Sequence, residues 1–445
     1  MRVGVRLRAY RFFQTTVIRR WVLPRRISRA WLGSLSHLPG LVPLKGAKKQ
    51  RRFPSEQPRV PIVWFHAASV GELESLIPLV ESLDHGDAAV VLSVFSESAA
   101  PLLERLAGEA RARGLNVLYA GISPWEGDWE RAFFAIRPRI FVTSKYEAWP
   151  DLWASLSRTN VPLVITGAQA RSSLRWAARI CTFLGVRLPE LHLLPIGTED
   201  SSALRKLFPE SSVEVVGDSR WDRVFQRATK GNSRARELIA RAQGFPRPWC
   251  ILGSVWVQDF GIWRGWLQSR PDGTIWVVPH KIDEASLLEI ERELREAGAG
   301  TWIRSRNWAK EGSGNGSLPE RCRTRVILVD EMGFLSELYS CADWAYVGGG
   351  FGEGVHSTIE PAIHGIPVAM GPAGSGKFPE VGQLLASRQL RIVRTVDELG
   401  HWWRFAMTAA PEFRERWILQ ARERLGASKR IVDRILDLLG QTGNP

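Results

Sequence analysis

Short hydrophobic runs alternate with amphipathic segments from residue 60 onwards. Helical spacing of apolar residues predicts helices over 71–83, 97–113, 127–136 and 150–158. The intervening apolar runs are rich in β-branched residues and have the length of buried strands: 60–67, 88–95, 115–120, 138–144, 161–168, 191–197 and 213–217. This alternation predicts an α/β fold with a mostly parallel sheet and helices on both faces.

A second series of the same kind begins near residue 248. Its predicted strands are 248–254, 273–280, 300–305, 324–330, 344–349 and 366–371. Its predicted helices are 258–268, 283–297, 332–340 and 358–364, followed by a long amphipathic helical segment over 411–440. The two series, joined around 222–246, predict two Rossmann-like doubly wound domains, 60–225 and 226–445. We expect them to face a cleft at the carboxyl ends of their strands.

The positive charge of the chain is concentrated before these domains. The whole chain carries a formal charge of +14, and residues 1–59 alone supply it, with fifteen Lys or Arg residues and Glu56. Phe12, Phe13, Trp21 and Trp31 lie among these basic residues, a pattern typical of a segment that lies on anionic lipid headgroups. We therefore predict that residues 1–59 form a membrane-association arm. A solvated tail and a nucleic-acid-binding tail are the alternatives.

Cysteine usage and ligand spacing bound the remaining chemistry. The four cysteines, Cys181, Cys250, Cys322 and Cys341, form no CxxC pair, so we expect a reducing compartment without a disulfide framework. No spacing typical of metal ligands occurs, and we expect neither a metal nor another cofactor. No apolar run is long enough to span a bilayer.

A glycine-rich loop follows the predicted strand 344–349. Gly348, Gly349, Gly350, Gly352 and Gly354 precede His356, Ser357 and Thr358 and the predicted helix. Glycine lets backbone approach a ligand closely, and a helix N-terminus attracts phosphate. Ser357 or Thr358 is the expected helix cap, and Glu360 is placed to accept hydrogen bonds from a ribose. We interpret the loop as a nucleotide-phosphate site. A plain tight turn and a dinucleotide fingerprint are the alternatives.

Two acidic motifs follow strands of the first series. In HAASVGELES (66–75), Ser69 and Glu72 have the spacing of a capping box, and Glu72 also fits a general base at the carboxyl end of a strand. The helix N-terminus favours its ionised form. In SKYEAWPDLW (144–153), Lys145 and Glu147 lie at another strand end, and an ordinary strand-to-helix turn is the alternative to a functional role.

These motifs, in order, resemble the Kdo transferases, inverting GT-B glycosyltransferases that attach 3-deoxy-manno-octulosonic acid (Kdo) from CMP-Kdo to lipid A. The segments that carry the resemblance are HAASVGE (66–72), EAWPDLW (147–153), VPLVITGAQARSSL (161–174), VVGDSRWDRV (215–224), ILGSVW (251–256), VVPHK (277–281), 330–372 and KFPE (377–380). The chain departs from the family at Lys145-Tyr146-Glu147, where many members have Glu-Thr-Glu, and at VWVQDF (255–260), which lacks the family's His and Glu.

The resemblance implies roles for individual residues. Glu72 is the expected catalytic base, in a domain that binds the acceptor with contributions from Ser69, Gly71, Lys145, Glu147 and Arg171. The expected CMP-Kdo site lies in the second domain, with Lys281 in place of a family arginine, and comprises Ser254, Pro279, His280, Lys281, Met332, Gly333, Gly349, Gly350, Gly352, Gly354, His356, Ser357, Thr358 and Glu360.

The resemblance also implies a setting. The expected enzyme acts on a lipid A precursor in lipopolysaccharide synthesis at the cytoplasmic face of the bacterial inner membrane, and no nucleic-acid partner is expected. Two alternatives are a GT-B transferase that uses another sugar nucleotide and a catalytically silent scaffold that binds membranes or nucleic acid.

Overall fold

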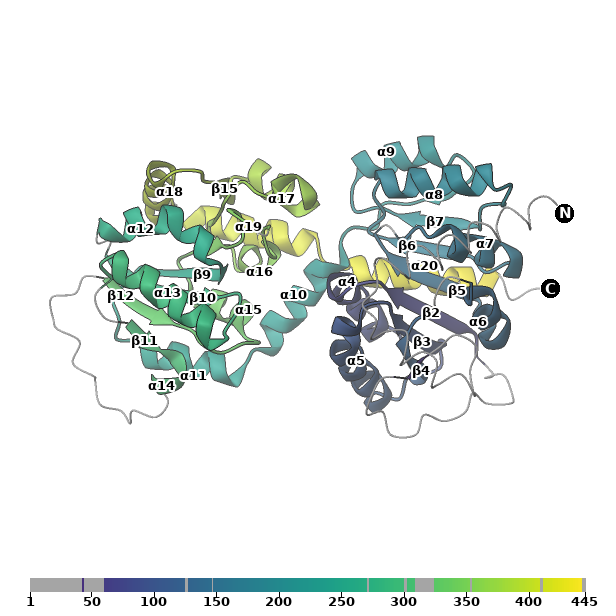
Figure 1. Cartoon of the computed structure of the whole chain (residues 1–445), viewed down its shortest axis with the longest axis horizontal. Coiled ribbons are helices and arrows are strands. Elements are labelled where there is room, and N and C mark those ends of the chain that lie inside the picture. The colour runs from purple at the N-terminus through teal and green to yellow at the C-terminus, as the bar shows by residue number, and fades with distance from the viewer. Residues whose placement is uncertain are drawn as a thin grey trace. The chain divides into compact units, whose positions relative to one another are not determined.

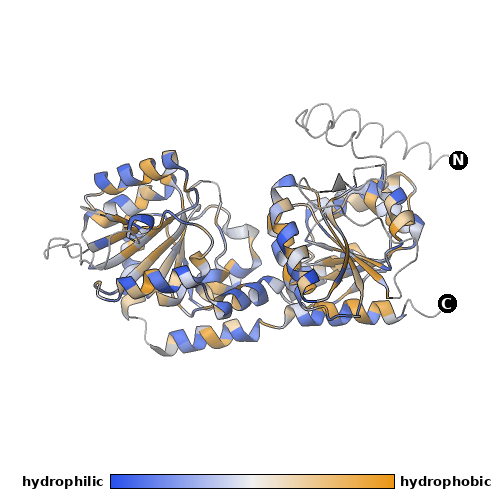
Figure 2. Cartoon of the chain, turned by 90° about the horizontal axis from the view of Figure 1, so that it is seen from below, coloured by the Kyte–Doolittle hydropathy of each residue, from blue (hydrophilic) through white to orange (hydrophobic). Residues whose placement is uncertain are grey.

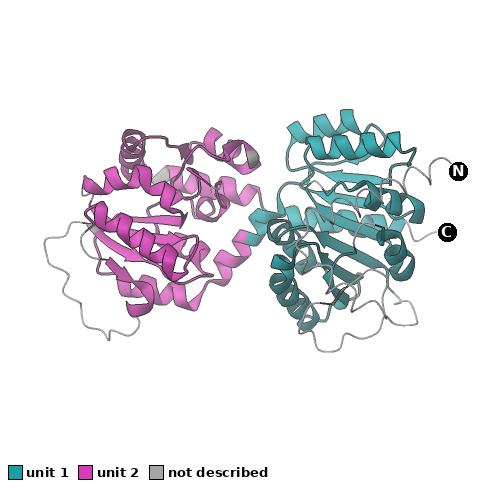
Figure 3. Cartoon of the chain, in the orientation of Figure 1, with its two compact units in different colours: residues 1–223, 425–445 teal, residues 224–424 magenta. Residues whose placement is uncertain are grey.

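The chain forms two compact units (Figure 3). The structure, a computed structural model, describes residues 42–43, 60–124, 127–145, 147–269, 272–299, 302–308, 324–352, 354–408 and 411–441. Unit 1 comprises residues 1–223 and 425–445, and unit 2 comprises residues 224–424. Apart from strand β1, the predicted arm over residues 1–59 lies outside the described residues.

Unit 1 is built on an eight-stranded sheet with strand order β1-β4-β3-β2-β5-β6-β7-β8. All pairs are parallel except β1 with β4. The strands are β1 (Val42–Pro43), β2 (Ile62–Ala67), β3 (Ala89–Val94), β4 (Asn116–Ile122), β5 (Ile140–Ser144), β6 (Leu163–Thr166), β7 (Leu191–Leu194) and β8 (Ser212–Val213). Strands β2, β3 and β5 are buried along their whole length, as expected for a sheet covered on both faces.

Helices cover both faces of this sheet (Figure 1). One hydrophobic core unites the sheet with α4 (Val70–Glu81), α5 (Ala100–Ala112) and α20 (Ala427–Gln441). The other unites it with α6 (Trp129–Ile136), α7 (Pro150–Thr159), α8 (Ser172–Phe183) and α9 (Thr198–Leu207). Helix α5 follows a 3-10 turn, η2 (Glu97–Ala99). The sequence patterns identified neither α8 nor α9.

Unit 2 contains a seven-stranded sheet of parallel pairs in the order β11-β12-β10-β9-β13-β14-β15. The strands are β9 (Trp249–Val255), β10 (Gly273–Pro279), β11 (Trp302–Arg304), β12 (Thr324–Leu328), β13 (Trp344–Val347), β14 (Val368–Met370) and β15 (Leu390–Ile392). In both units the strands carry hydrophobic colours, and hydrophilic residues gather on the outward helix faces (Figure 2). The α/β, GT-B-like architecture predicted from the sequence is thus confirmed.

Helices also cover both faces of the second sheet. They are α11 (Ser233–Ala242), η3 (Val257–Asp259), α12 (Phe260–Gln268), α13 (Glu284–Glu296), α14 (Ser305–Trp308), α15 (Leu335–Leu338), η4 (Tyr339–Cys341), α16 (Ile359–Ala362), η5 (Ser375–Lys377), α17 (Pro379–Ala386), α18 (Val396–Thr408) and α19 (Pro411–Glu423). Helix α10 (Ser219–Lys230) contains the division between the units.

The C-terminal segment differs from the prediction in two ways. The amphipathic helical segment predicted over 411–440 consists of two helices, which are separated where Gly426 adopts a left-handed conformation with φ of +84°. The second helix, α20, belongs to unit 1 and not to the predicted domain 226–445. Its apolar face, including Ile431 and Ile435, is buried in the core that also contains α4. Asp222 accepts hydrogen bonds from the N–H groups of Gly426 and Ser428, at 2.6 Å each, which fixes the start of α20.

Candidate active site

Three parallel strands of unit 1 end beside one another at the edge where the predicted acidic motifs lie. Strand β2 leads into α4, β5 leads into the turn with Lys145 and Glu147, and β6 leads through Gly167 towards Arg171. Since the carboxyl ends of parallel strands meet at one edge of a sheet, side chains distant in sequence come together there.

The Glu72 side chain is held at the start of α4 in a capping box. Its Oε2 accepts hydrogen bonds from the N–H groups of Ala68, at 2.8 Å, and Ser69, at 3.2 Å. Ser69 Oγ accepts from the Glu72 N–H at 3.4 Å. The carboxylate is 5% exposed and is turned back towards the end of β2. The capping interaction is therefore confirmed, and the role of Glu72 as a base stays a prediction.

The electrostatics of Glu72 differ from the expectation. Burial raises the pKa of its carboxyl group, and this effect outweighs the backbone hydrogen bonds and the charge of Lys145, which both lower the pKa. The backbone N–H groups at the start of α4 lower the pKa of Glu72, as expected for a helix N-terminus, but the burial of this place raises it by more. A carboxylate with a raised pKa is a stronger proton acceptor.

Lys145 and Glu147 are both electrostatically coupled to Glu72. Strand β5 ends at Ser144, and Lys145 adopts a left-handed backbone with φ of +64° while its N–H donates to the Thr166 carbonyl at 2.7 Å. Glu147, 6% exposed, accepts a hydrogen bond from Trp149 Nε1 at 2.7 Å. The fold thus brings two acids and one base together.

The pKa of Glu147 is raised to about 7, first by burial and then by the negative charge of Glu72, with the Trp149 hydrogen bond opposing both. The folded state therefore keeps a proton that the unfolded chain releases near pH 4.5. The contribution of Glu147 to the free energy of unfolding therefore falls as the pH rises from about 4.5 to about 7, and it stays low above pH 7.

Replacing Glu147 with glutamine is expected to stabilise the protein above pH 7 and to change little near pH 4.5. Glutamine removes the buried charge and still accepts the Trp149 hydrogen bond, so the gain is on the order of 3 kcal/mol at alkaline pH. Thermal unfolding of both proteins across this pH range measures it. A difference in melting temperature that is constant with pH would show that Glu147 is not the titrating group.

The other predicted residues at this edge differ in how far they are exposed. Ser69 and Gly71 are exposed, and a side chain at position 71 would meet open space. Arg171 is half-buried immediately before α8, and its Nε donates to Gln169 Oε1 at 2.7 Å. His66, in the same motif as Glu72, is a core residue: burial lowers its pKa to about 3, and its Nδ1 lies 3.0 Å from Ser93 Oγ.

In unit 2 the glycine loop begins where β13 ends, and its first glycines pack backbone against backbone. A Cβ at Gly348 would lie 2.5 Å from the Ser254 carbonyl oxygen, and one at Gly350 would lie 2.5 Å from Gly371 Cα. Gly349 and Gly354 have φ of +90° and +110°. These glycines are required by the fold of the loop itself.

Four N–H groups of the loop donate to acceptors within the protein, and the phosphate-binding role of the loop stays a prediction. The Gly348 N–H donates to the Gly253 carbonyl oxygen, and the Gly349 N–H donates to Asp259 Oδ2. The N–H groups of Gly352 and Gly354 both donate to the Gly349 carbonyl oxygen. Helix α16 is a single turn, and neither Ser357 nor Thr358 forms the expected side-chain cap. Thr358 is fully buried, and its Oγ1 has no hydrogen-bond partner among the described residues.

Asp259 is the residue that organises this loop, and the sequence reasoning missed it. Its side chain is fully buried and accepts hydrogen bonds from the Gly349 N–H at 2.9 Å, the Trp256 N–H at 2.9 Å and the Tyr346 hydroxyl at 2.8 Å. Burial raises its pKa, and these hydrogen bonds oppose the increase. The sequence offered no distinctive signal for it, because Trp256 is not a residue type that caps a helix.

His280 and His356, distant in sequence, stack with ring centroids 4.3 Å apart. Trp256 also stacks on His280, at 4.5 Å, and its Nε1 lies 3.3 Å from His356 Nε2. Since Trp256 and His356 are in direct contact, they lie on the same face of the His280 ring. Lys281 Nζ lies 5.1 Å from the centre of the Trp256 ring. The structure thus gathers His280, Lys281 and His356 around Trp256, at the carboxyl ends of β9 and β10.

Glu360 is engaged by a cation from α10. Arg227 Nη1 lies 3.8 Å from Glu360 Oε1, and Arg227 Nη2 lies 3.9 Å from Glu337 Oε2. Of the remaining predicted residues, Ser254 has a positive φ of +53°, Pro279 is buried at the end of β10, Met332 is 67% exposed and Gly333 has φ of +99°. Their role in ligand binding stays a prediction.

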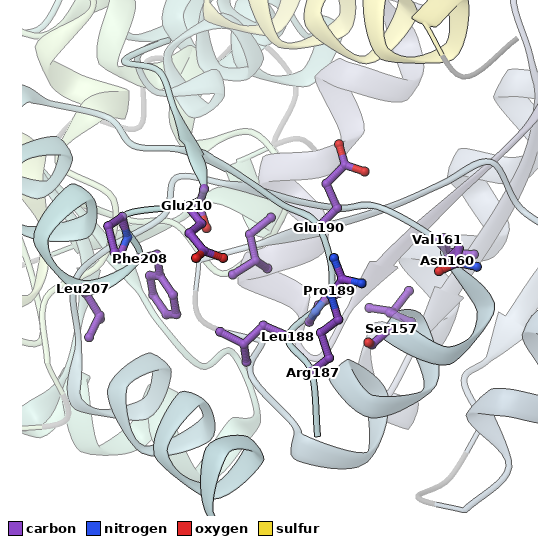
Figure 4. A pocket seen from close by; sticks show the side chains of 14 residues that line it. Ser157, Asn160, Val161, Arg187, Leu188, Pro189, Glu190, Leu207, Phe208 and Glu210 are labelled. Atoms are coloured by element: carbon purple, nitrogen blue, oxygen red, sulfur yellow. The ribbon is translucent and has the colours of Figure 1, made fainter. Parts of the chain in front are cut away.

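A cavity of about 610 Å³ lies at the opposite edge of the unit 1 sheet (Figure 4). Apolar side chains such as Leu188, Leu207 and Phe208 line it together with the charged Arg187 and Glu190. It contains none of the predicted site residues. Among the described residues no group of His, Cys, Asp or Glu side chains is arranged to hold a metal ion, and no helix there is long and apolar enough to cross a membrane.

Sequence and structure comparisons place the chain among known proteins. Residues 45–223 match the sequence profile of the 3-deoxy-D-manno-octulosonic-acid transferases, or kdotransferases. The 3-deoxy-D-manno-octulosonic acid transferase of Bordetella pertussis is 27% identical over 398 residues, covering 85% of this chain and 87% of that protein. That of Haemophilus influenzae is 25% identical over 394 residues, covering 85% and 86%.

Solved structures share the fold at low sequence identity. UDP-GlcNAc 2-epimerase from Neisseria meningitidis has a TM-score of 0.59 and 12% identity, covering 84% of this chain and all of that one. A glycosyltransferase from Rickettsia africae has a TM-score of 0.53 and 10% identity, covering 87% and 100%. The sequence matches and the fold together show that this chain is a glycosyltransferase that is similar to the Kdo transferases over most of its length.

Proposed function

We propose that this protein transfers Kdo from CMP-Kdo to a hydroxyl group of a lipid A precursor, with inversion at the anomeric carbon. The names of the sequence relatives support Kdo as the transferred sugar. The resemblance of the sequence motifs to the Kdo transferases supports a lipid A precursor as the acceptor. The observation that carries the chemistry is the buried Glu72, with a raised pKa, at the carboxyl edge of the unit 1 sheet beside Lys145 and Glu147.

Glu72 is the proposed general base. The acceptor hydroxyl oxygen forms a bond with the anomeric carbon of Kdo while the bond from that carbon to the CMP phosphate breaks, and its electron pair leaves with the phosphate. The hydroxyl proton passes to Glu72 Oε. Lys145 keeps the carboxylate ionised enough to receive that proton, and Glu147 raises its proton affinity when it is itself ionised.

Unit 2 is the proposed donor site. The half-buried His280 and His356 and the exposed Lys281 lie around Trp256 and supply the polar and cationic groups for CMP-Kdo. Ser357 adds an exposed hydroxyl beside them. In this proposal Glu360 exchanges its contact with Arg227 for the ribose hydroxyls. The proposed reaction uses no metal, since Lys281 offsets charge on the departing phosphate.

We further propose that the reaction takes place at the cytoplasmic face of the inner membrane, on an anionic lipid surface. The acceptor is itself a membrane lipid, and the fifteen basic residues of the predicted arm suit such a surface.

The test is a transfer assay with purified full-length protein, CMP-Kdo and a tetra-acylated lipid A precursor, read by mass spectrometry. We expect products heavier by whole Kdo units. Parallel reactions with other sugar nucleotides address the alternative donor. No product with any donor would refute catalysis, and product only with another donor would refute Kdo as the sugar.

A further inference from the structure

Helix α8 carries an unusual local charge. The rest of the chain after residue 59 is balanced between basic and acidic residues, yet the segment 171–189 contains Arg171, Arg175, Arg179 and Arg187 and no acidic residue. The basic residues are therefore not confined to the predicted arm. Just before this segment, Asp200 Oδ1 of α9 accepts a hydrogen bond from the Ala170 N–H at 3.2 Å.

The outward face of α8 also bears two large aromatic side chains. Leu174, Ala177 and Cys181 are fully buried in the unit 1 core and define the inward face. Trp176 is 55% exposed and Phe183 is 72% exposed. A helical spacing of seven residues places both on one stripe, and Arg179 lies between them on the same stripe.

We propose that this face of α8 is a docking surface for an anionic phospholipid bilayer. Trp and Phe side chains favour the headgroup level of a membrane, where their rings leave water without entering a binding pocket. The neighbouring arginines bind lipid phosphates, while their hydrocarbon stems lie along the apolar layer. A bilayer is favoured over nucleic acid, because lipid headgroups can dock on the face of one helix, whereas a nucleic-acid strand needs a groove that tracks its phosphate backbone.

The position of α8 connects the docking surface with the acceptor site, and this step rests on the proposed function. The helix follows β6 and begins at Ser172, at the sheet edge where β5 and β6 end and Lys145 is bonded to Thr166. Its twelve residues extend about 18 Å from that edge. A bilayer against α8 therefore lies next to the proposed acceptor site, and a lipid acceptor reaches Glu72 without leaving the membrane completely.

The test uses full-length protein and vesicles of phosphatidylcholine with and without phosphatidylglycerol. One variant combines Trp176→Ser with Phe183→Ser, and a second combines Arg175→Ser with Arg179→Ser. The matched control, Leu288→Ser with Arg292→Ser, removes an exposed apolar residue and an exposed arginine one turn apart on α13 of unit 2. Co-sedimentation measures partitioning, and transfer is measured to acceptor in vesicles and in detergent micelles.

We expect the arginine variant to lose about 25-fold in partitioning to anionic vesicles, since each basic residue at such a surface contributes roughly fivefold. The aromatic variant loses binding to both vesicle types, and the control behaves as wild type. Transfer falls for acceptor in vesicles and not in micelles. Undiminished vesicle binding by both variants would overturn the proposal. The proposal would also be overturned if the variants bound a nucleic-acid duplex more weakly but bound vesicles as well as wild type does. Absence of transfer by the wild-type protein would refute the proposed function. Co-sedimentation with vesicles would still test the docking surface.

Discussion

Replacing Glu72 with glutamine is expected to lower the rate of sugar transfer by a factor of about 10² to 10⁴, the usual contribution of a general base. Glutamine cannot take the acceptor proton. It does fill the same buried space and can complete the capping box with Ser69, so α4 should stay folded. The rate is measured with saturating donor and acceptor, and thermal unfolding verifies that the variant is not destabilised. A variant with nearly normal turnover would exclude Glu72 as the base.

Ser69→Ala separates catalysis from capping. It removes the hydroxyl that accepts the Glu72 N–H and is expected to cost about 1 kcal/mol of stability. The Glu72 carboxylate keeps its bonds to the N–H groups of Ala68 and Ser69, so turnover should change only a few-fold. If Ser69→Ala reduces turnover as much as Glu72→Gln, the contribution of Glu72 is to the structure of α4 and not to proton transfer.

Replacing Gly350 with alanine is expected to destabilise unit 2 by about 3 kcal/mol or more and to abolish donor binding. The new Cβ would lie 2.5 Å from both Cα and N of Gly371. Backbone atoms in the middle of a packed loop cannot move aside as the end of a flexible side chain can. The loop must therefore separate from the start of the segment after β14, which also breaks the hydrogen bond from Ala373 N–H to Gly350 O.

Gly352→Ala is the matched control in the same loop. Gly352 is exposed, its φ is not positive, and the nearest atoms to an added Cβ belong to the flexible Gln258 side chain at 3.5 Å. Stability should change by less than about 1 kcal/mol. The two variants are compared by thermal unfolding and by the stabilisation that added CMP produces. Equal behaviour of the two would show that loop glycines are interchangeable and that close packing at Gly350 is not what requires it.

These controls reflect a division among the glycines that the sequence cannot show. Neighbouring backbone atoms leave no room for a side chain at Gly348 or Gly350. Gly349 is required by its φ of +90° and by its hydrogen bond to Asp259. Gly352, in contrast, has space around it. Five glycines close together predict an unusual backbone path. Which of them faces a ligand and which faces the protein depends on the atoms that fold against them.

Much of the fold was predictable because the dominant signal is local. Buried parallel strands such as β2 and β10 are continuous apolar runs, and α4 and α13 repeat apolar residues at helical spacing. The ends of the elements were less predictable. The predicted helix over 358–364 is the single turn α16, and α8 was missed between two strand-like runs, because its inward face needs only Leu174, Ala177 and Cys181.

The sequence by itself determined the two α/β series, the charge of residues 1–59 and the ordered motifs of the Kdo transferase family, since each depends on residue type and spacing alone. Only the tertiary structure decided that α20 returns to unit 1, that Asp259 anchors the glycine loop, that Lys145 lowers the pKa of Glu72 and that Glu72 raises the pKa of Glu147. These features arise from contacts between residues far apart in the chain. Burial and neighbouring charge, which set the pKa of a carboxyl group, exist only after those contacts have formed.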